Sequence, residues 1–158
     1  MKKIDWKNLS YDDFTGFVAV TAILLFVLYF GGLWYTTYDY RIQMRDQMVE
    51  MYQQLPNPIP PIEDDYGVHQ RWLVFYIDGV KVLNKPQPEN VINEYKKALE
   101  KEGWATEREY EHVRNDKNKI YGINMRKGEF ILSVSARENR DSINIHLIKR
   151  DWIYNKGF

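Results

Sequence analysis

Three histidines are the residues of this chain best suited to acid–base or metal chemistry, and they stand far apart: His69, His112 and His146. None belongs to an H-x-x-x-H motif or lies next to a carboxylate at ligand spacing, so the sequence predicts no metal site. His146 stands between Ile145 and Leu147 in an alternating stretch, and we expect it on the solvated face of a strand.

Nucleophilic chemistry has equally little support in the sequence. Ser133 and Ser135 alternate along one predicted strand, but the G-x-S-x-G motif is absent, as are the glycine motifs that bind phosphates or dinucleotides. The chain has no cysteine, which removes thiolate metal sites, disulfides and thiol nucleophiles together. We therefore predict that the protein is not an enzyme and has no catalytic, cofactor-binding or metal-binding residues.

The charges are balanced over the whole chain, with 22 basic and 22 acidic residues. Residues 63–158 alone contain 17 Lys and Arg against 16 Asp and Glu. Nucleic-acid-binding proteins usually carry a clear basic excess, because counterion release drives their affinity. The sequence therefore predicts no nucleic-acid partner.

The most prominent element of the sequence is the stretch 14–35, which has 22 consecutive positions without a charge and divides the chain into a short tail and a longer C-terminal part. As a helix this stretch is ~33 Å long, enough to cross a hydrocarbon core of ~30 Å. We predict a transmembrane helix over 14–35 that contacts the lipid bilayer, preceded by a short tail over 1–13. The run exceeds the apolar region of a cleaved signal peptide and lacks an A-x-A site, which favours an uncleaved signal anchor.

The flanking residues indicate an orientation in the cell membrane. The N-terminal flank carries three lysines and the near C-terminal flank carries two arginines, and the positive-inside rule then places the N-terminus in the cytoplasm and the C-terminal domain outside it. Aromatic residues gather at both ends of the span and resemble two interfacial belts. They are Trp6, Tyr11 and Phe14 on one side, and Trp34, Tyr35, Tyr38 and Tyr40 on the other.

Residues 36–55 contain no proline, and we expect a juxtamembrane helix there. Met44, Met48, Met51 and Leu55 form one apolar stripe at 4-3-4 spacing. The stripe could bind a partner helix, because methionine adapts to varied surfaces, or it could pack on the protein's own domain. We favour self-packing, and the stripe remains a candidate interaction surface.

Residues 56–69 begin with four prolines in six positions, which predicts a semi-rigid spacer before a domain over 70–158. In that domain, apolar runs over 72–77 and 80–83 flank Asp78-Gly79, which predicts a hairpin with a type I′ turn. Pro88 opens a helix with an apolar stripe, and Gly103 is placed to end it.

Alternating apolar residues over 119–126, 129–137 and 142–149 predict three antiparallel strands, and 107–113 is a possible fourth. In the predicted registers, Leu132 lies beside Leu147 and Met125 lies opposite Phe130. The predicted fold is a single-pass transmembrane helix followed by a small α+β domain, with an antiparallel meander of about five to six strands and one covering helix. Ile131, Ile148 and Tyr76 interrupt the otherwise polar outer face. Scattered exposed apolar residues are normal on protein surfaces, and a partner surface is the alternative interpretation. We take Ile131, Ile148 and His146 as a second candidate interaction surface.

Three functions are compatible with this plan. The first is a non-enzymatic, membrane-anchored interaction module of a bacterial-type cell-envelope complex, with an unspecified protein partner. The second rests on Lys2-Lys3, then Gly16-Phe17, then a long apolar helix that leads into an antiparallel sheet, a plan that resembles type IV prepilins and pseudopilins. That resemblance implies cleavage after Gly16, although Thr21 stands where the family normally has Glu. The third is a membrane-tethered sensor of a small ligand.

Overall fold

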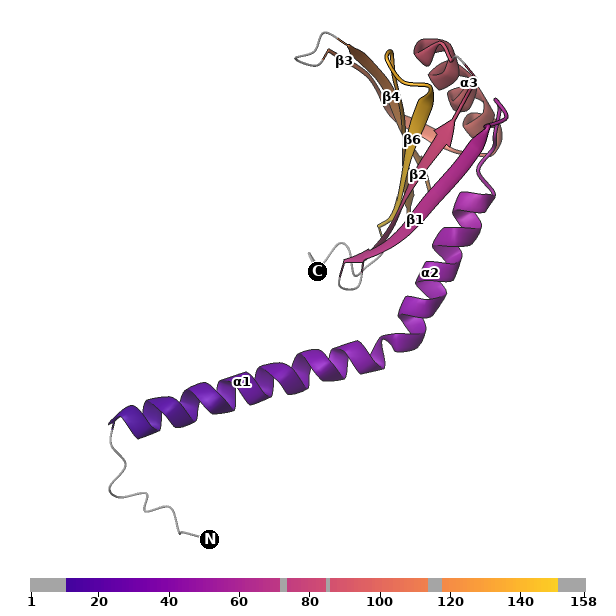
Figure 1. Ribbon diagram of the computed structural model, residues 1–158. Helices are drawn as coiled ribbons and strands as arrows, with labels where there is room; N and C mark the ends of the chain where they lie inside the picture. The colour runs from indigo at the N-terminus through magenta and orange to yellow at the C-terminus, as the bar shows by residue number, and fades with distance from the viewer. Residues whose placement is uncertain (1–10, 72–73, 85, 114–117, 151–158) are drawn as a thin grey trace. The chain divides into compact units, whose positions relative to one another are not determined.

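The computed structural model describes residues 11–71, 74–84, 86–113 and 118–150, with side chains from Thr15 onward (Figure 1). The chain consists of two units, residues 1–42 and residues 43–158. Most of the predicted tail, the aromatic side chains proposed for the first belt, and Trp72 lie outside the described residues.

The first unit consists mainly of helix α1, Tyr11–Thr36. Its segment Thr15–Thr36 is long and apolar enough to cross a membrane, and its large apolar side chains are exposed. The helix predicted over 14–35 is confirmed, and it begins three residues earlier than expected, inside the predicted tail.

Helix α2, Tyr38–Gln53, follows after a one-residue interruption at Thr37. The hydroxyl groups of Thr36 and Thr37 donate hydrogen bonds to the carbonyl groups of Gly32 and Leu33, at 2.9 and 2.7 Å. Such back-bonding competes with the regular helix ladder and often bends it. The helix predicted over 36–55 is therefore present, but shorter at both ends.

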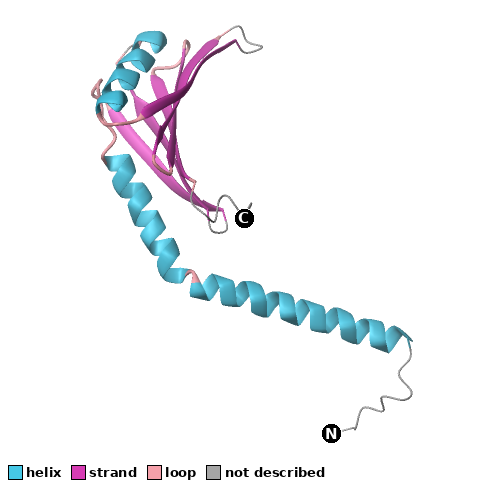
Figure 2. Ribbon diagram, turned by 180° about the vertical axis from the view of Figure 1, so that it is seen from behind, coloured by secondary structure: helices cyan, strands magenta, loops and turns pink. Residues whose placement is uncertain are grey.

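The second unit is built on a six-stranded antiparallel sheet with the order β1-β2-β6-β5-β4-β3. Figure 2 shows the strands of this sheet in magenta. The strands are β1 Glu63–Arg71, β2 Val74–Val82, β3 Ala105–Val113, β4 Lys119–Lys127, β5 Phe130–Arg137 and β6 Ser142–Lys149. Strands β3 to β6 form the predicted meander. Helix α3, Pro88–Lys101, connects the β1–β2 hairpin to it, and β2 pairs with β6.

The hairpin predicted at Asp78-Gly79 is wrong, because β2 continues straight through both residues. Gly79 lies beneath the Tyr52 ring, where a Cβ atom would overlap the phenol, so glycine here serves a close approach and not a turn. Strand β1 begins inside the predicted linker and occupies its residues 63–69. It was missed because an exposed edge strand shows no alternation of apolar and polar residues.

Helix α3 begins and ends where the sequence predicts. Gly103 has a φ of +84°, and the Trp104 N–H donates to the Leu99 carbonyl at 3.0 Å, which is the backbone bond of a Schellman cap. The α3 residues buried against the sheet are Val91, Ile92, Tyr95 and Leu99.

The strand registers agree with the sequence in part. Leu132 lies opposite Leu147 as predicted. Met125, however, lies opposite Leu132 and not Phe130, because the turn residues are Gly128-Glu129, with Gly128 at φ +60°. A shift of two residues keeps every side chain on its predicted face, so the core survives the error.

Two helices, and not one, cover the inner face of the sheet. Figure 1 shows α3 over one part of it. Met44, Met48 and Leu55 are buried within the second unit, and Met51 is half-buried. The stripe therefore packs on the protein's own domain, which is the self-packing interpretation.

A buried lysine attaches α2 and the proline segment to the sheet. The Lys81 side chain, 1% exposed, points its Nζ at the Asp64 carboxylate (3.0 Å) and the Asn57 carbonyl (2.5 Å), beside the Tyr52 ring. The Tyr52 hydroxyl donates to Asp64 at 3.2 Å. Burial, and secondly the Asp64 charge, raises the pKa of Tyr52, so the hydroxyl keeps its proton and can donate.

Candidate functional site

The face of the sheet opposite to α3, which we call the open face, is the candidate site. The inner residues of the strands are buried, so the alternate residues project to the open face. Strand pairing arranges these side chains in rows that cross the sheet.

One row is apolar. Tyr76 on β2 lies opposite Ile148 on β6, and Ile148 lies opposite Ile131 on β5. All three are half-buried, and Val80 on the same face is exposed. Three large apolar side chains on three adjacent strands form a continuous strip. Such a strip is more informative about binding than apolar residues scattered singly over a surface.

The neighbouring row is polar and contains His146. Asp78, His146, Ser133 and Asn124 follow one another across β2, β6, β5 and β4. His146 Nδ1 lies 2.6 Å from the Asp78 carboxylate. A carboxylate only accepts hydrogen bonds, so Nδ1 carries the proton.

His69 approaches Asp78 from the edge strand. Its Nε2 lies 3.8 Å from the second oxygen of Asp78, and its ring stacks on Tyr76 with 5.1 Å between centroids. The Tyr76 and His146 rings are 5.6 Å apart. The sequence did not reveal this cluster, because the residues come from three strands and their meeting depends on the β1–β2 and β2–β6 registers.

The cluster presents hydrogen-bonding side chains at the surface. The side chains of His69, Asp78 and His146 are each about half exposed, so the contacts among them add little to stability. Within the described part of the chain, no three His, Cys, Asp or Glu residues are placed to hold a metal ion. What the cluster offers is hydrogen-bonding groups beside an apolar strip, a combination found at protein interfaces.

A shallow groove of about 550 Å³ continues the open face over β3, β4 and β5. The Tyr110 ring lies over Gly122, where a Cβ atom would overlap it, and this contact shapes the groove. The other residues along the groove are mainly polar: Arg108, Glu111, His112, Ile120, Asn124, Ser133 and Ser135.

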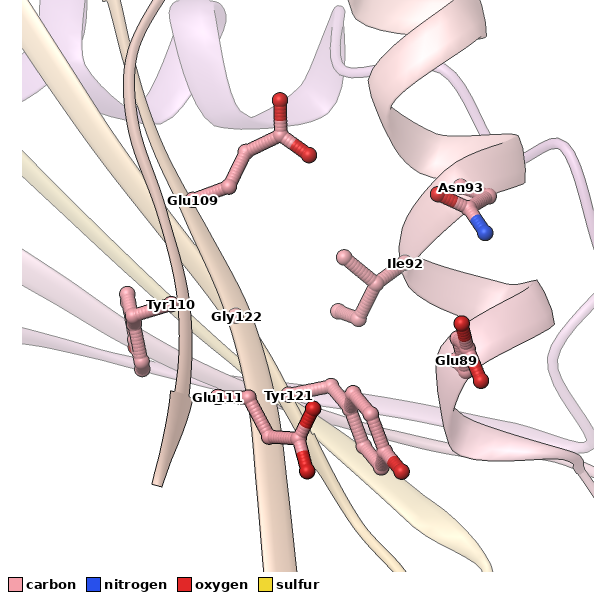
Figure 3. Close-up of a pocket in the computed structure, with 8 residues that line it drawn as sticks. All are labelled: Glu89, Ile92, Asn93, Glu109, Tyr110, Glu111, Tyr121 and Gly122. Atoms are coloured by element: carbon pink, nitrogen blue, oxygen red, sulfur yellow. The ribbon is translucent and has the colours of Figure 1, made fainter.

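A second hollow, of about 250 Å³, lies on the inner side between α3 and strands β3 and β4 (Figure 3). Glu89, Glu109 and Glu111 surround it, while Tyr110 points away. Lys96 pairs with Glu109 at 2.5 Å and Lys119 with Glu111 at 2.7 Å, and hydrogen bonding to these carboxylates raises the pKa of both lysines. Two of the three carboxylates around this hollow, those of Glu109 and Glu111, are thus already paired with lysines.

The structure brings together one of the two surfaces predicted from sequence. Ile131, Ile148 and His146 lie side by side on the open face, whereas the methionine stripe is packed on the inner side.

Comparison of the chain with protein-family models, with curated proteins and with solved structures finds no match.

Proposed function

We propose that this protein is a single-pass membrane protein whose α+β domain binds another protein through the open face, as a non-enzymatic part of a cell-envelope complex. The observation that carries the proposal is the in-register strip of Tyr76, Ile148 and Ile131, flanked by the Asp78–His146 pair. Protein interfaces combine aromatic and aliphatic anchors with a polar rim in this way.

The anchor is the segment Thr15–Thr36, because an exposed apolar helix of 22 residues is stable in a bilayer and costly in water. At its C-terminal end, the Arg41 guanidinium stacks on Trp34, 3.4 Å from the ring centroid, and donates to the Trp34 carbonyl at 2.9 Å. Aromatic and basic residues of this kind suit a membrane interface. The lysine-rich N-terminal flank supports a cytoplasmic N-terminus.

Photocrosslinking in intact membranes tests the proposed surface. A photoreactive amino acid at Ser133, on the open face, should give an adduct with one heterologous protein. The same group at Glu94, exposed on α3, is the matched control and should give none. Equal adducts from both positions, or none from Ser133, would contradict the proposal.

The two alternatives make different predictions. A prepilin-like protein is cleaved after Gly16, so an intact first residue on the mature chain excludes the prepilin-like function. A mature chain that starts at Phe17 would instead favour the prepilin-like function over the interaction module proposed here. A ligand sensor would be stabilised thermally by a small molecule, for which the 550 Å³ groove is the place to look.

A further inference from the structure

The two edge strands of the sheet differ in the charges that they would present to a second copy of this chain. Among the described residues, β1 pairs with β2 alone and β3 pairs with β4 alone. An edge strand offers a row of backbone N–H and C=O groups to any strand that can lie beside it.

Strand β1 has the regular form that such pairing needs. Its nine residues pair with β2 without a register shift, and nearly all of them are exposed. Its first half is acidic and its last residues are His69, Gln70 and Arg71, with Gly67 at the centre.

This pattern is complementary to itself in the antiparallel direction. When two copies of β1 pair about a two-fold axis through Gly67, Glu63 faces Arg71 and Asp65 faces His69, both on the open face. On the inner face Tyr66 faces Val68, and each of these side chains is 37% exposed in the single chain. The opposite charges of Glu63 and Arg71 and the apolar contact of Tyr66 with Val68, directly across antiparallel strands, stabilise the pairing.

The other edge, strand β3, lacks this complementarity. The same operation on β3 places Glu107 opposite Glu111 and Glu109 opposite its own copy, so no pair of opposite charges forms across the two strands. Strand β3 also carries a register shift between Thr106 and Arg108, a device that protects sheet edges.

We infer that this protein forms a homodimer in which the two β1 strands pair antiparallel about Gly67. The axis is perpendicular to the sheet, so both copies keep their helices on one side, and the two open faces join into one surface of twelve strands. The occupant of the β1 edge is thus a second copy of the chain.

Charge reversal tests the pairing in the full-length protein in detergent. Glu63→Lys and Arg71→Glu each replace two attractive pairs per dimer by repulsive ones and should weaken dimerisation roughly tenfold, which corresponds to about 1.4 kcal/mol. The double variant should restore dimerisation. Glu107→Lys on β3 is the control and should leave the dimer unchanged, as measured by sedimentation velocity.

Disulfide trapping gives an independent readout, because the chain has no native cysteine. Gly67→Cys should form a covalent dimer on mild oxidation, with the flexible His69 ring moving aside. Glu63→Cys should not, because its two copies would be separated by ~27 Å along the paired strands. A monomer, a dimer indifferent to the β1 reversals, or equal trapping at both positions would overturn the inference.

Discussion

The Lys81 ammonium lies 3.0 Å from the Asp64 carboxylate, inside a domain that leaves the lysine almost no contact with solvent. Around this pair meet β1, β2, the C-terminal part of α2 and the proline segment, through Tyr52 and Asn57. The pair thereby holds the C-terminal part of α2 and the proline segment against the sheet.

Removing the charge of Asp64 should destabilise the domain. Asp64→Asn leaves the Lys81 ammonium buried without its counter-ion, and we expect a loss of about 2 kcal/mol, less than for a fully buried pair because Asp64 is partly exposed. Lys81→Met should cost less, because the remaining carboxylate can be hydrated. Chemical denaturation of the full chain in detergent measures both. Glu102→Gln, which removes an exposed charge after α3, is the control, and equal losses from Asp64→Asn and Glu102→Gln would contradict this role.

The contact between Gly79 and Tyr52 should appear as an energetic coupling. Gly79→Ala forces the Tyr52 ring away and should cost about 2 kcal/mol by overpacking. In a Tyr52→Ala background the same substitution should cost much less, because the ring is gone. A double-mutant cycle measured by denaturation gives the coupling. Additive losses would show that the two residues do not constrain each other.

Two buried tyrosines predict a specific alkaline sensitivity. Burial, with a smaller contribution from Asp64, raises the pKa of both Tyr52 and Tyr95 above the ordinary value of about 10. The folded state then holds these protons more tightly than the unfolded state, so their contribution is complete below about pH 10 and is lost as the pH rises further.

Tyr95→Phe isolates one of these groups. Because the Tyr95 hydroxyl is buried and has no hydrogen-bond partner among the described residues, the substitution should be nearly neutral in stability at pH 7. The loss of stability between about pH 9 and pH 11 should be smaller in the variant than in the parent chain. Identical pH profiles would contradict the assignment.

Membrane attachment should depend on the apolar character of α1. Leu24→Arg combined with Leu25→Arg places two charges in the middle of Thr15–Thr36, at an insertion cost of about 3 kcal/mol each. We expect the doubly substituted chain to leave the membrane fraction after a carbonate wash, while the matched double alanine variant remains. Retention of the arginine variant would contradict a transmembrane anchor.

The sequence was most informative where local chemistry decides the structure. The stripe and cap of α3 and the alternation in β4, β5 and β6 each depend on residues close in sequence, and those elements were predicted correctly. The hairpin predicted at Asp78-Gly79 was wrong because the glycine there serves the close approach of the Tyr52 ring, a tertiary contact that the local sequence does not reveal.

The candidate site could be predicted only in part. Ile131 and Ile148 were identifiable as apolar residues on a polar face, and His146 was identifiable as a polar residue two positions before Ile148 on the same face. The His69–Asp78–His146 cluster was not identifiable, because β1 carries no periodic signal and its register was unknown. The same exposed character that hid β1 is what makes it available as an edge.

The central claim is that a partner protein covers the open face while the chain is anchored in its native membrane. Cysteine accessibility tests this claim most directly. The native chain has no cysteine, so Ser133→Cys and Glu94→Cys each carry a single reporter. The account predicts that a membrane-permeant maleimide labels Ser133→Cys slowly in native membranes and fast after purification, whereas Glu94→Cys labels fast in both. Equal labelling rates of Ser133→Cys in native membranes and in the purified chain would contradict it.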